Sequence, residues 1–317
     1  MRCPSIAELP PPPVGKTGWP WSVECARLPE TMADGSLWPR VSVVTPSFNQ
    51  GQFLEETIRS VLLQGYPNLE YIIIDGASSD SSVEIIRRYE PWLTYWVSEQ
   101  DRGQSHAINK GFARASGEIL TWLNSDDCLL PKALVTVATS HREAPGAAAW
   151  VGGCYRVTPD GRILGTVMPR GLERENLVAW SVRGFFYQPS CFIAARDLQA
   201  AGPLDENLHF ALDLDLWLRL AGIGTLVLVP AMLSAAKIHA SAKTQAQRSK
   251  MHLDILITQL KHGYRSEAEN FLALLLEKPS LAEHLRLWLN ARWRGLGARL
   301  KRRTKPVYLQ DVIEAKS

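Results

Sequence analysis

Short apolar runs alternate with segments of helical periodicity along the first half of the chain. Each run is continuous in aliphatic and aromatic residues, as expected for a strand that is covered on both faces. The runs lie at 41–45, 71–74, 93–97 and 118–123. Between them, apolar residues recur every three or four positions and predict amphipathic helices at 52–64, 83–89 and 107–115. This alternation predicts an α/β fold, in which helices flank both faces of a mainly parallel sheet.

The second half of the chain contains the same kinds of element in a less regular order. Further strands are expected at 150–157, 163–168, 185–193 and 225–229. Turn residues at 159–162 indicate a hairpin between the first two of these strands. Further helices are expected at 131–141, 213–221, 249–262, 266–277 and 281–303.

Residues 1–39 contain eight of the 20 prolines, a density that excludes regular helices and strands. This segment is therefore expected to be an extended arm. Its tryptophans at 19, 21 and 38 indicate that part of it packs on the main body, and a disordered tail is the alternative. The chain is accordingly expected to have three parts: the arm at 1–39, an α/β domain at 40–244 and a helical, basic extension at 245–317.

The composition is that of a globular protein with a sizeable core, since 46% of the 317 residues are hydrophobic. The net charge of +3 is too small for bulk binding of polyanions. The five cysteines are widely spaced and include no Cys-x-x-Cys pair, which argues against a disulfide framework and a zinc site. Neither a signal peptide nor a membrane-spanning run is visible, so a cytoplasmic location is expected.

Polar clusters follow three of the predicted strands at the point where each strand ends. Asp75 follows the second strand, residues 99–105 follow the third, and Asn124 to Asp127 follow the fourth. Because ligands bind at the carboxyl ends of parallel strands, these clusters are expected to form one site.

Asp126 and Asp127 are adjacent carboxylates at the end of a buried strand, where they repel each other and lose hydration. A divalent cation with oxygen ligands, Mg²⁺ or Mn²⁺, would relieve this repulsion and would also bridge to phosphate. The alternative is a turn with a helix cap, because Asn, Ser and Asp favour both.

The chain resembles the family 2 glycosyltransferases, which have the nucleotide-diphospho-sugar transferase (GT-A) fold. The resemblance covers about two thirds of the chain and rests on five motifs in order. They are VSVVTPSFN at 41–49, IIIDGASSD at 72–80, EQDRGQSHAINKG at 99–111, NSDD at 124–127 and DLDLWLR at 213–219. The chain departs from the family pattern at Asn124, where the first metal-motif carboxylate is expected. It also departs at Gly76, after a single acidic residue, and at Leu212, before Asp213.

This resemblance implies an enzyme that moves a sugar from a UDP-, GDP- or dTDP-sugar to a hydroxyl acceptor. It also implies that the configuration at the anomeric carbon is inverted. Asp126 and Asp127 would hold the metal, and Asp213 would be the catalytic base. The expected nucleotide and substrate residues are Thr45, Pro46, Ser47, Asn49, Asp75, Asp101, Arg102, Gln104, Lys110, Asn124, Gln188, Asp215 and His239. For Asp213, a plain helix cap is the alternative, and for His239 a structural histidine.

Two other functions remain open from the sequence. Neither a dinucleotide fingerprint nor a P-loop follows the first strand, which counts against dehydrogenases and P-loop proteins. A sugar-phosphate nucleotidyltransferase would need a Gly-rich, basic segment at 46–51, which this chain lacks. A non-catalytic nucleotide-sugar-binding module is the second alternative, because fold does not determine function.

Residues 281–305 combine an apolar stripe with eight basic residues. These are Arg286, Arg292, Arg294, Arg299, Lys301, Arg302, Arg303 and Lys305. A basic amphipathic helix with tryptophans predicts docking on an anionic membrane surface, and a helix packed on the domain is the alternative. Nucleic acid is not expected, since no recognition motif accompanies the charge. Such a peripheral membrane location would suit a lipid-linked acceptor in polysaccharide or glycolipid assembly, as the resemblance implies.

Overall fold

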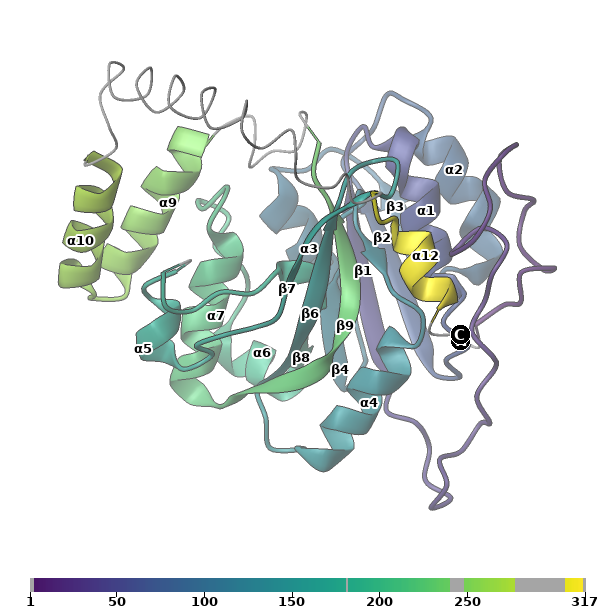
Figure 1. Cartoon of the computed structure of the whole chain (residues 1–317), viewed down its shortest axis with the longest axis horizontal. Helices are drawn as coiled ribbons and strands as arrows, with labels where there is room; N and C mark the ends of the chain where they lie inside the picture. Colours follow the sequence, from purple (N-terminus) through teal and green to yellow (C-terminus); the bar gives the residue numbers. More distant parts are fainter. Residues whose placement is uncertain (1–2, 181, 240–247, 277–305, 316–317) are drawn as a thin grey trace, which may run out of the picture.

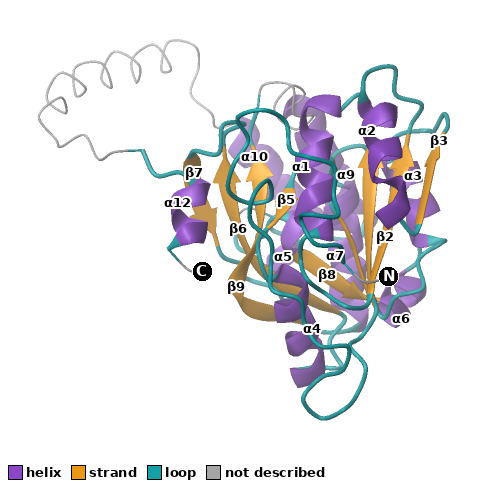
Figure 2. Cartoon of the chain, turned by 90° about the vertical axis from the view of Figure 1, so that its right-hand side faces the viewer, coloured by secondary structure: helices purple, strands orange, loops and turns teal. Residues whose placement is uncertain are grey.

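The computed structural model describes residues 3–180, 182–239, 248–276 and 306–315. Within these residues, nine strands form one sheet that is flanked by helices on both faces (Figures 1 and 2). The strands are β1 Val41–Ser47, β2 Leu69–Asp75, β3 Tyr95–Ser98, β4 Ile119–Trp122, β5 Cys128–Leu129, β6 Ala149–Val157, β7 Ile163–Val167, β8 Cys191–Ala194 and β9 Leu226–Lys237. Their spatial order is β3-β2-β1-β4-β8-β6-β9-β5, with β7 paired to the outside of this path on β6.

The first four strands form the parallel part of the sheet, in the order β3-β2-β1-β4. Val41 pairs with both Leu69 and Ile119, so these three strands begin at the same level. Beyond β4 the sheet is mixed, because β8 runs antiparallel to its neighbours while β6 and β9 run parallel to each other. The α/β fold with a mainly parallel sheet is therefore confirmed in the half that was most regular in sequence.

Successive residues of the buried strands enter two different cores. Val41 and Val43 pack into the core on one face, whereas Val44 packs into the core on the other face. In β2, Tyr71 and Ile73 belong to the first core and Ile72 and Ile74 to the second. This division explains why the strand sequences are continuously apolar, since side chains alternate between two covered faces.

The helices are α1 Gly51–Leu62, α2 Ser82–Tyr89, α3 Gln104–Phe112, α4 Ala133–Glu143, α5 Arg174–Leu177, α6 Ala195–Ala201, α7 Leu212–Ile223, α9 Arg248–Lys261, α10 Arg265–Leu276 and α12 Leu309–Glu314, with 3₁₀ turns η1 Glu90–Trp92 and η2 Gln188–Ser190. Every helix expected before residue 277 is present, within a few residues of its predicted bounds. Helices α5 and α6 were not predicted, because each has only one buried residue and so shows no periodic apolar pattern.

Two strand predictions differ from the structure. The segment predicted as a strand at 185–193 is mostly irregular, and only Cys191–Ala194 is a strand. Pro189, which has no N–H to donate, lies in η2 instead. Strand β9 is much longer than the predicted 225–229 and ends at Lys237, which pairs with Val157. Lys237 is therefore a buried strand residue, beyond the end of the strand that the sequence predicted.

The N-terminal arm packs on the domain rather than forming a disordered tail. The fully buried guanidinium of Arg59 in α1 donates to the backbone carbonyls of Pro10, Pro20 and Trp21 at 2.8–3.1 Å. The indole N–H of Trp19 donates to the carbonyl of Leu129 at 2.9 Å. An extended, proline-rich backbone has unpaired carbonyls, and these contacts satisfy several of them.

The C-terminal residues return to the arm. The amide of Trp19 donates to the Gln310 side chain at 2.8 Å, and Leu309 and Ile313 are buried. The adjoining backbone extends the β6–β7 hairpin, since the Ile163 N–H donates to the Val307 carbonyl at 2.9 Å. The helix expected at 281–303 lies outside the described residues.

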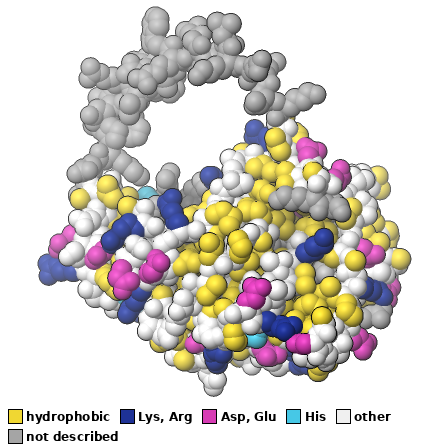
Figure 3. Space-filling model, turned by 60° about the horizontal axis from the view of Figure 1, so that its bottom comes forward, with side chains coloured by type: hydrophobic (Ala, Val, Ile, Leu, Met, Phe, Trp, Pro, Cys, Tyr) yellow, Lys and Arg dark blue, Asp and Glu magenta, His cyan; other side chains and the backbone are white. Residues whose placement is uncertain are grey.

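Two global properties accompany this fold. On the face seen in Figure 3, basic and acidic side chains are interspersed among wide hydrophobic areas, in keeping with a net charge of +3. Among the residues that the structure describes, no helix has the length and hydrophobicity needed to cross a bilayer.

Candidate active site

The carboxyl ends of the parallel strands meet at one edge, as the order of polar clusters predicted. Ser47 at the end of β1 is in register with Asp75 at the end of β2, which is in turn in register with Ser98 of β3. On the other side of β1, the N–H of Leu123 donates to Val44, so Asn124 leaves the sheet at the same edge. The loops after these strands therefore share one region, which we call the strand-end edge.

Asp75 organises the turn after β2. Its buried carboxylate accepts hydrogen bonds from the Ser78 amide at 2.9 Å, the Ser78 hydroxyl at 2.6 Å and the Ser98 hydroxyl at 2.6 Å. These bonds hold the acidic turn against β3. In this structure Asp75 thus has a clear structural role, and any contact with a nucleotide base would be made in addition to these bonds.

The end of β1 and the loop after it contain two buried polar atoms without a hydrogen-bond partner among the described residues, Ser47 Oγ and Gln50 Oε1. Thr45 points into the core, where its hydroxyl lies 3.0 Å from the Tyr71 hydroxyl, and Pro46 is buried beside it. Asn49 has a left-handed backbone (φ 51°) and accepts from the Ser79 amide. The buried Ser47 hydroxyl has no hydrogen-bond partner within the described part of the chain. Buried polar groups are rarely left unpaired, so this hydroxyl is available to a ligand.

The loop after β3 stands against the acidic turn. A Cβ atom placed on Gly76 would lie only 2.7 Å from a carboxylate oxygen of Asp101, so a larger residue here would have to displace this side chain. The other Asp101 oxygen accepts from the Gly103 amide at 2.7 Å. The departure from the family pattern at Gly76 therefore has a steric reason in this chain.

The two basic residues predicted to meet phosphate are paired with carboxylates. Arg102 forms a 2.7 Å ion pair with Glu206, and Lys110 forms one with Glu99. Arg102 is largely exposed in this pair, so its ion pair is screened by solvent and readily exchanged.

Asn124 is the centre of a chain of amide side chains across the strand-end edge. Its Oδ1 accepts from Gln104 at 2.8 Å, and its Nδ2 lies 3.4 Å from the Gln188 oxygen. Gln188 in turn donates to the carbonyl of Trp122 at 2.7 Å. These bonds connect α3, the loop after β4 and η2, so three of the predicted site residues are brought together.

Asp126 and Asp127 follow in the same loop and have different surroundings. Asp126 Oδ2 lies 3.0 Å from His239 Nε2, with the carboxylate partly exposed. Asp127 is buried, and its pKa is raised well above the ordinary value by burial and then by the charge of Asp126, although Lys237 opposes this. The hydroxyl of Thr57 fixes the loop by donating to the carbonyls of residues 125 and 127.

The donors near this pair fit a divalent cation in their chemistry but do not form a complete site. Among the described residues, no group of three acidic, histidine or cysteine side chains is arranged to hold a metal. Asp126, Asp127 and His239 nevertheless supply oxygen and imidazole donors within one small region.

Asp213 lies in the first turn of α7, next to the start of β8. Its negative charge raises the pKa of the buried Cys191 thiol further, after burial itself. The carbonyl of Cys191 accepts from Thr121 in β4 at 2.8 Å, which places this side of α7 beside the strand that leads to Asn124. The carboxylate also accepts from the Leu214 amide at 2.8 Å.

Asp215, two residues further on, is in a different environment. It is completely buried and lies within 3.0 Å of Arg219, Lys261 and His262. Burial alone would raise its pKa, but the bonds from His262 and Lys261 and the charge of Arg219 hold the pKa well below its ordinary value. The structure thus places Asp215 in the interface of α7 with α9, and not among the predicted substrate contacts.

The sequence did not identify a buried lysine beneath the acidic pair. The Lys237 ammonium lies 3.3 Å from Glu56 and 3.2 Å from the Cys128 sulfur, and its backbone amide donates to Asp127. Burial alone would lower its pKa, but the neighbouring Cys128 and Glu56 raise it. Only pairing between distant strands brings Lys237 here, so no local pattern signals it.

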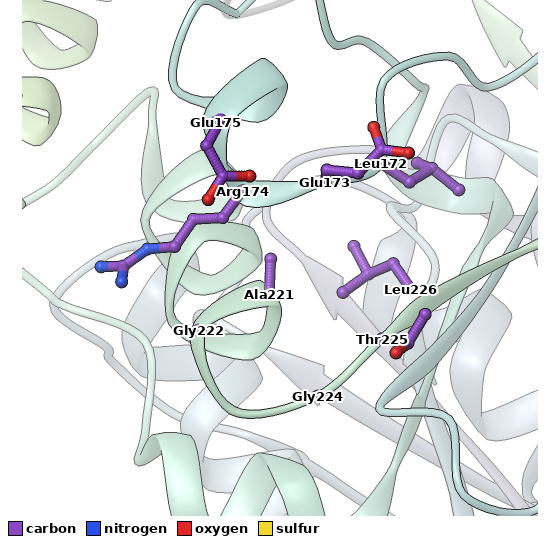
Figure 4. Close-up of a pocket in the computed structure, with 9 residues that line it drawn as sticks. All are labelled: Leu172, Glu173, Arg174, Glu175, Ala221, Gly222, Gly224, Thr225 and Leu226. Atoms are coloured by element: carbon purple, nitrogen blue, oxygen red, sulfur yellow. The ribbon is translucent and has the colours of Figure 1, made fainter.

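A pocket of about 380 Å³ opens elsewhere, between α5 and the end of α7 (Figure 4). It is lined by residues 172–175, 221, 222 and 224–226. Strand β9 begins at Leu226, so the pocket lies at the opposite end of this strand from Lys237. None of the residues predicted from sequence to form the site lines this pocket.

Known proteins of similar sequence include several glycosyltransferases. Residues 42–199 match the model of glycosyl transferase family 2. An uncharacterized glycosyltransferase of Mycobacterium tuberculosis is 37% identical over 132 residues, which are 41% of this chain and 50% of that protein. A GalNAc(5)-diNAcBac-PP-undecaprenol beta-1,3-glucosyltransferase of Campylobacter jejuni is 32% identical over 145 residues, 44% of this chain and 46% of that protein. The matches thus span about half the length of these curated relatives.

A solved structure has the same fold. The mannosyltransferase PcManGT of Pyrobaculum calidifontis, in complex with GDP-Man and Mn²⁺, matches 93% of this chain and 86% of its own. Its TM-score is 0.54 at 18% identity, which shows a shared fold and no more. With the ordered motifs, the strand-end edge and the family model in agreement, the chain belongs to glycosyltransferase family 2 and has the GT-A fold.

Proposed function

We propose that this protein transfers a sugar from a nucleoside-diphosphate sugar to a hydroxyl acceptor, with Mg²⁺ or Mn²⁺ as cofactor. The observation that carries the proposal is the meeting of Asp126, Asp127 and His239 at the strand-end edge, the edge that also holds the unpaired hydroxyl of Ser47. Membership of family 2 supports the reaction class.

The nucleotide would occupy the edge between the loops after β1, β2 and β3. The Ser47 hydroxyl is free to bond a ribose or base, and the Asp75 turn and Asp101 close this end of the site. Arg102 would reach the diphosphate by exchanging its exposed bond with Glu206, which solvent already weakens.

The cation would be held by Asp126, with Asp127 and His239 as neighbouring donors. When bound, it supplies positive charge that stabilises the diphosphate leaving group. Metal ligands bind in their deprotonated forms, so the cation would be held by ionised carboxylates and a neutral imidazole nitrogen. The positive charge of the nearby Lys237 favours the ionised form of Asp127.

Asp213 is proposed as the general base. It would take the proton of the acceptor hydroxyl as that oxygen attacks the anomeric carbon and the nucleoside diphosphate leaves. One carboxylate suffices for such a single displacement with inversion, and its place in the first turn of α7 supports this assignment. We assign the role to Asp213 rather than to Asp215, because Arg219, Lys261 and His262 are bonded to the Asp215 oxygens.

The acceptor is proposed to be a lipid-linked sugar of a cell-envelope polysaccharide or glycolipid. The name of the Campylobacter relative includes an undecaprenol-linked oligosaccharide, which supports this class. A basic segment at 281–305 would bring the enzyme to the anionic cytoplasmic face of a membrane, where such acceptors are exposed.

Incubation with nucleotide sugars tests the proposal against its alternatives. Saturation-transfer NMR against a panel of UDP-, GDP- and dTDP-sugars identifies the donor, and slow donor hydrolysis with and without Mn²⁺ then reports catalysis. Binding without any metal-dependent turnover would favour the non-catalytic module. Formation of a nucleotide sugar from a nucleoside triphosphate and a sugar phosphate would favour the nucleotidyltransferase.

A further inference from the structure

Helix α9 holds the backbone that leads into the helix carrying Asp213. A single carboxylate oxygen of Asp254 accepts two backbone hydrogen bonds, from the amides of His209 and Phe210, each 2.8 Å long. These two residues lie just before Ala211, the N-cap of α7. Hydrogen bonds to an ionised acceptor are about twice as strong as neutral ones, so this contact fixes the entry of the chain into α7.

The same helix holds α7 at a second point, just after Asp213. Lys261 Nζ lies 2.9 Å and His262 Nε2 lies 3.0 Å from Oδ1 of Asp215, which is fully buried. A buried carboxylate with these partners is costly to separate from them. The first turn of α7 is therefore attached to α9 on both sides of residue 213.

A third bond from α9 reaches the chain segment that leads to Gln188. The buried Gln259 side chain donates to the carbonyl of Val178 at 2.7 Å. Residue 178 begins the segment that ends at Gln188, which contacts Asn124 at the strand-end edge. Helix α9 thus contacts both the segment that leads into α7 and the segment that leads to Gln188.

We propose that Asp254, Lys261 and His262 are positioning residues that set the carboxylate of Asp213 for proton transfer. This inference rests on the proposed role of Asp213 as general base. All three residues lie far beyond residue 199, where the match to the family model ends, so the helical extension forms part of the catalytic unit. General-base catalysis is sensitive to displacement, and a shift of about 1 Å costs up to about 100-fold in rate.

A double-mutant cycle tests the inference in the full-length protein. Asp254→Ala removes both backbone bonds, whereas Asp254→Asn keeps an acceptor oxygen in the same place. We expect Asp254→Ala to lower kcat by about 10- to 100-fold with unchanged donor affinity, and Asp254→Asn to retain most of the rate. In the Asp213→Asn background, Asp254→Ala should have less than about a two-fold further effect, because it acts through a base that is no longer there.

Two further variants complete the experiment. Lys261→Met removes a bond to Asp215 and leaves the Asp254 contact intact. It should lower kcat in the otherwise wild-type protein and have little further effect on kcat in the Asp213→Asn background. Glu269→Ala, which breaks an exposed ion pair with Arg265 in α10, is the matched control and should leave kcat unchanged. Equal effects of Asp254→Ala in both backgrounds, or none in the wild type, would overturn the positioning role. Wild-type activity of Asp213→Asn itself would instead overturn the proposed base, which is a separate result.

Discussion

His239 Nε2 lies 3.0 Å from Oδ2 of Asp126, although 113 residues separate them in the chain. The histidine follows the end of β9, and its ring packs at 4.7 Å on Phe53 of α1. Three elements therefore converge on the candidate metal loop. A cation at Asp126 would have to share this oxygen with the imidazole or displace it, so nucleotide binding and the His239 contact should be linked.

The first prediction concerns metal-dependent donor binding. Asp126→Ala should abolish turnover and remove most of the Mn²⁺-dependent part of nucleoside-diphosphate binding, because the remaining donors cannot hold the cation. Isothermal titration calorimetry with and without Mn²⁺ measures this part. Asp160→Ala, which changes an exposed aspartate in the 159–162 turn, is the matched control. Unchanged Mn²⁺-dependent affinity in the Asp126 variant would refute the assignment.

The second prediction concerns the base. Asp213→Asn keeps the shape and the bond to the Leu214 amide but cannot accept a proton. Turnover should fall by about 10²- to 10⁴-fold while donor affinity stays near that of the wild type. Steady-state kinetics together with calorimetry separate the two quantities. A variant that transfers sugar at the wild-type rate would place the base elsewhere in the site.

The third prediction concerns stability and pH. Asp215→Asn leaves Arg219 and Lys261 without their buried anion, and it should lower the free energy of unfolding at pH 7 by about 2 kcal/mol. This value allows for the partial exposure of Lys261. Urea denaturation measures the loss, and Glu84→Gln, an exposed residue of α2, is the control.

The sign of the pH effect follows from the lowered pKa of Asp215. A carboxyl that is more acidic when folded stabilises the protein at every pH above its unfolded pKa, about 3.9 for Asp. The stabilisation is lost as the pH falls from there through the folded pKa. The difference between wild type and Asp215→Asn should therefore be constant from pH 7 to about 5 and shrink below about pH 4. A difference that grows on acidification would contradict this account.

The fourth prediction concerns the N-terminal arm. Arg59→Met removes the buried donor to three arm carbonyls, so it should cost about 3 kcal/mol of unfolding free energy and expose residues 3–21 to proteases. Denaturation and limited proteolysis measure the two effects, with the exposed Arg87→Met as control. An arm that stays protected in the Arg59 variant would show that other contacts suffice.

The fifth prediction concerns the membrane, and the fold decides how to test it. Deleting everything after residue 278 would also remove α12, which is bonded to Trp19 through Gln310. Replacing Arg292, Arg294 and Arg299 with glutamine avoids that damage. At low salt the wild type should sediment with vesicles of anionic lipid, and a smaller fraction of the variant should do so. Equal binding of both proteins, or none by the wild type, would refute membrane docking through this segment.

Much of the fold was predictable because local patterns encode it. Alternate burial of Val43 and Val44 in two cores requires a continuous apolar run, and such a run is visible without a structure. Helix α6 was missed because only Leu198 of its residues is buried. The long β9 was missed because its later pairing partners, in β6, lie some 80 residues earlier, and pairing rather than propensity keeps it extended.

The sequence by itself determined the α/β architecture, the family and the clustering of Asp75, Asn124 and Asp126 at one edge. Each of these depends on residues that lie within one strand or loop, where periodicity and turn chemistry act. Only the tertiary structure decided the different surroundings of the two aspartates of α7. Asp213 and Asp215 are two positions apart on a helix and so point in different directions, and which of them meets Lys261 depends on where α9 packs.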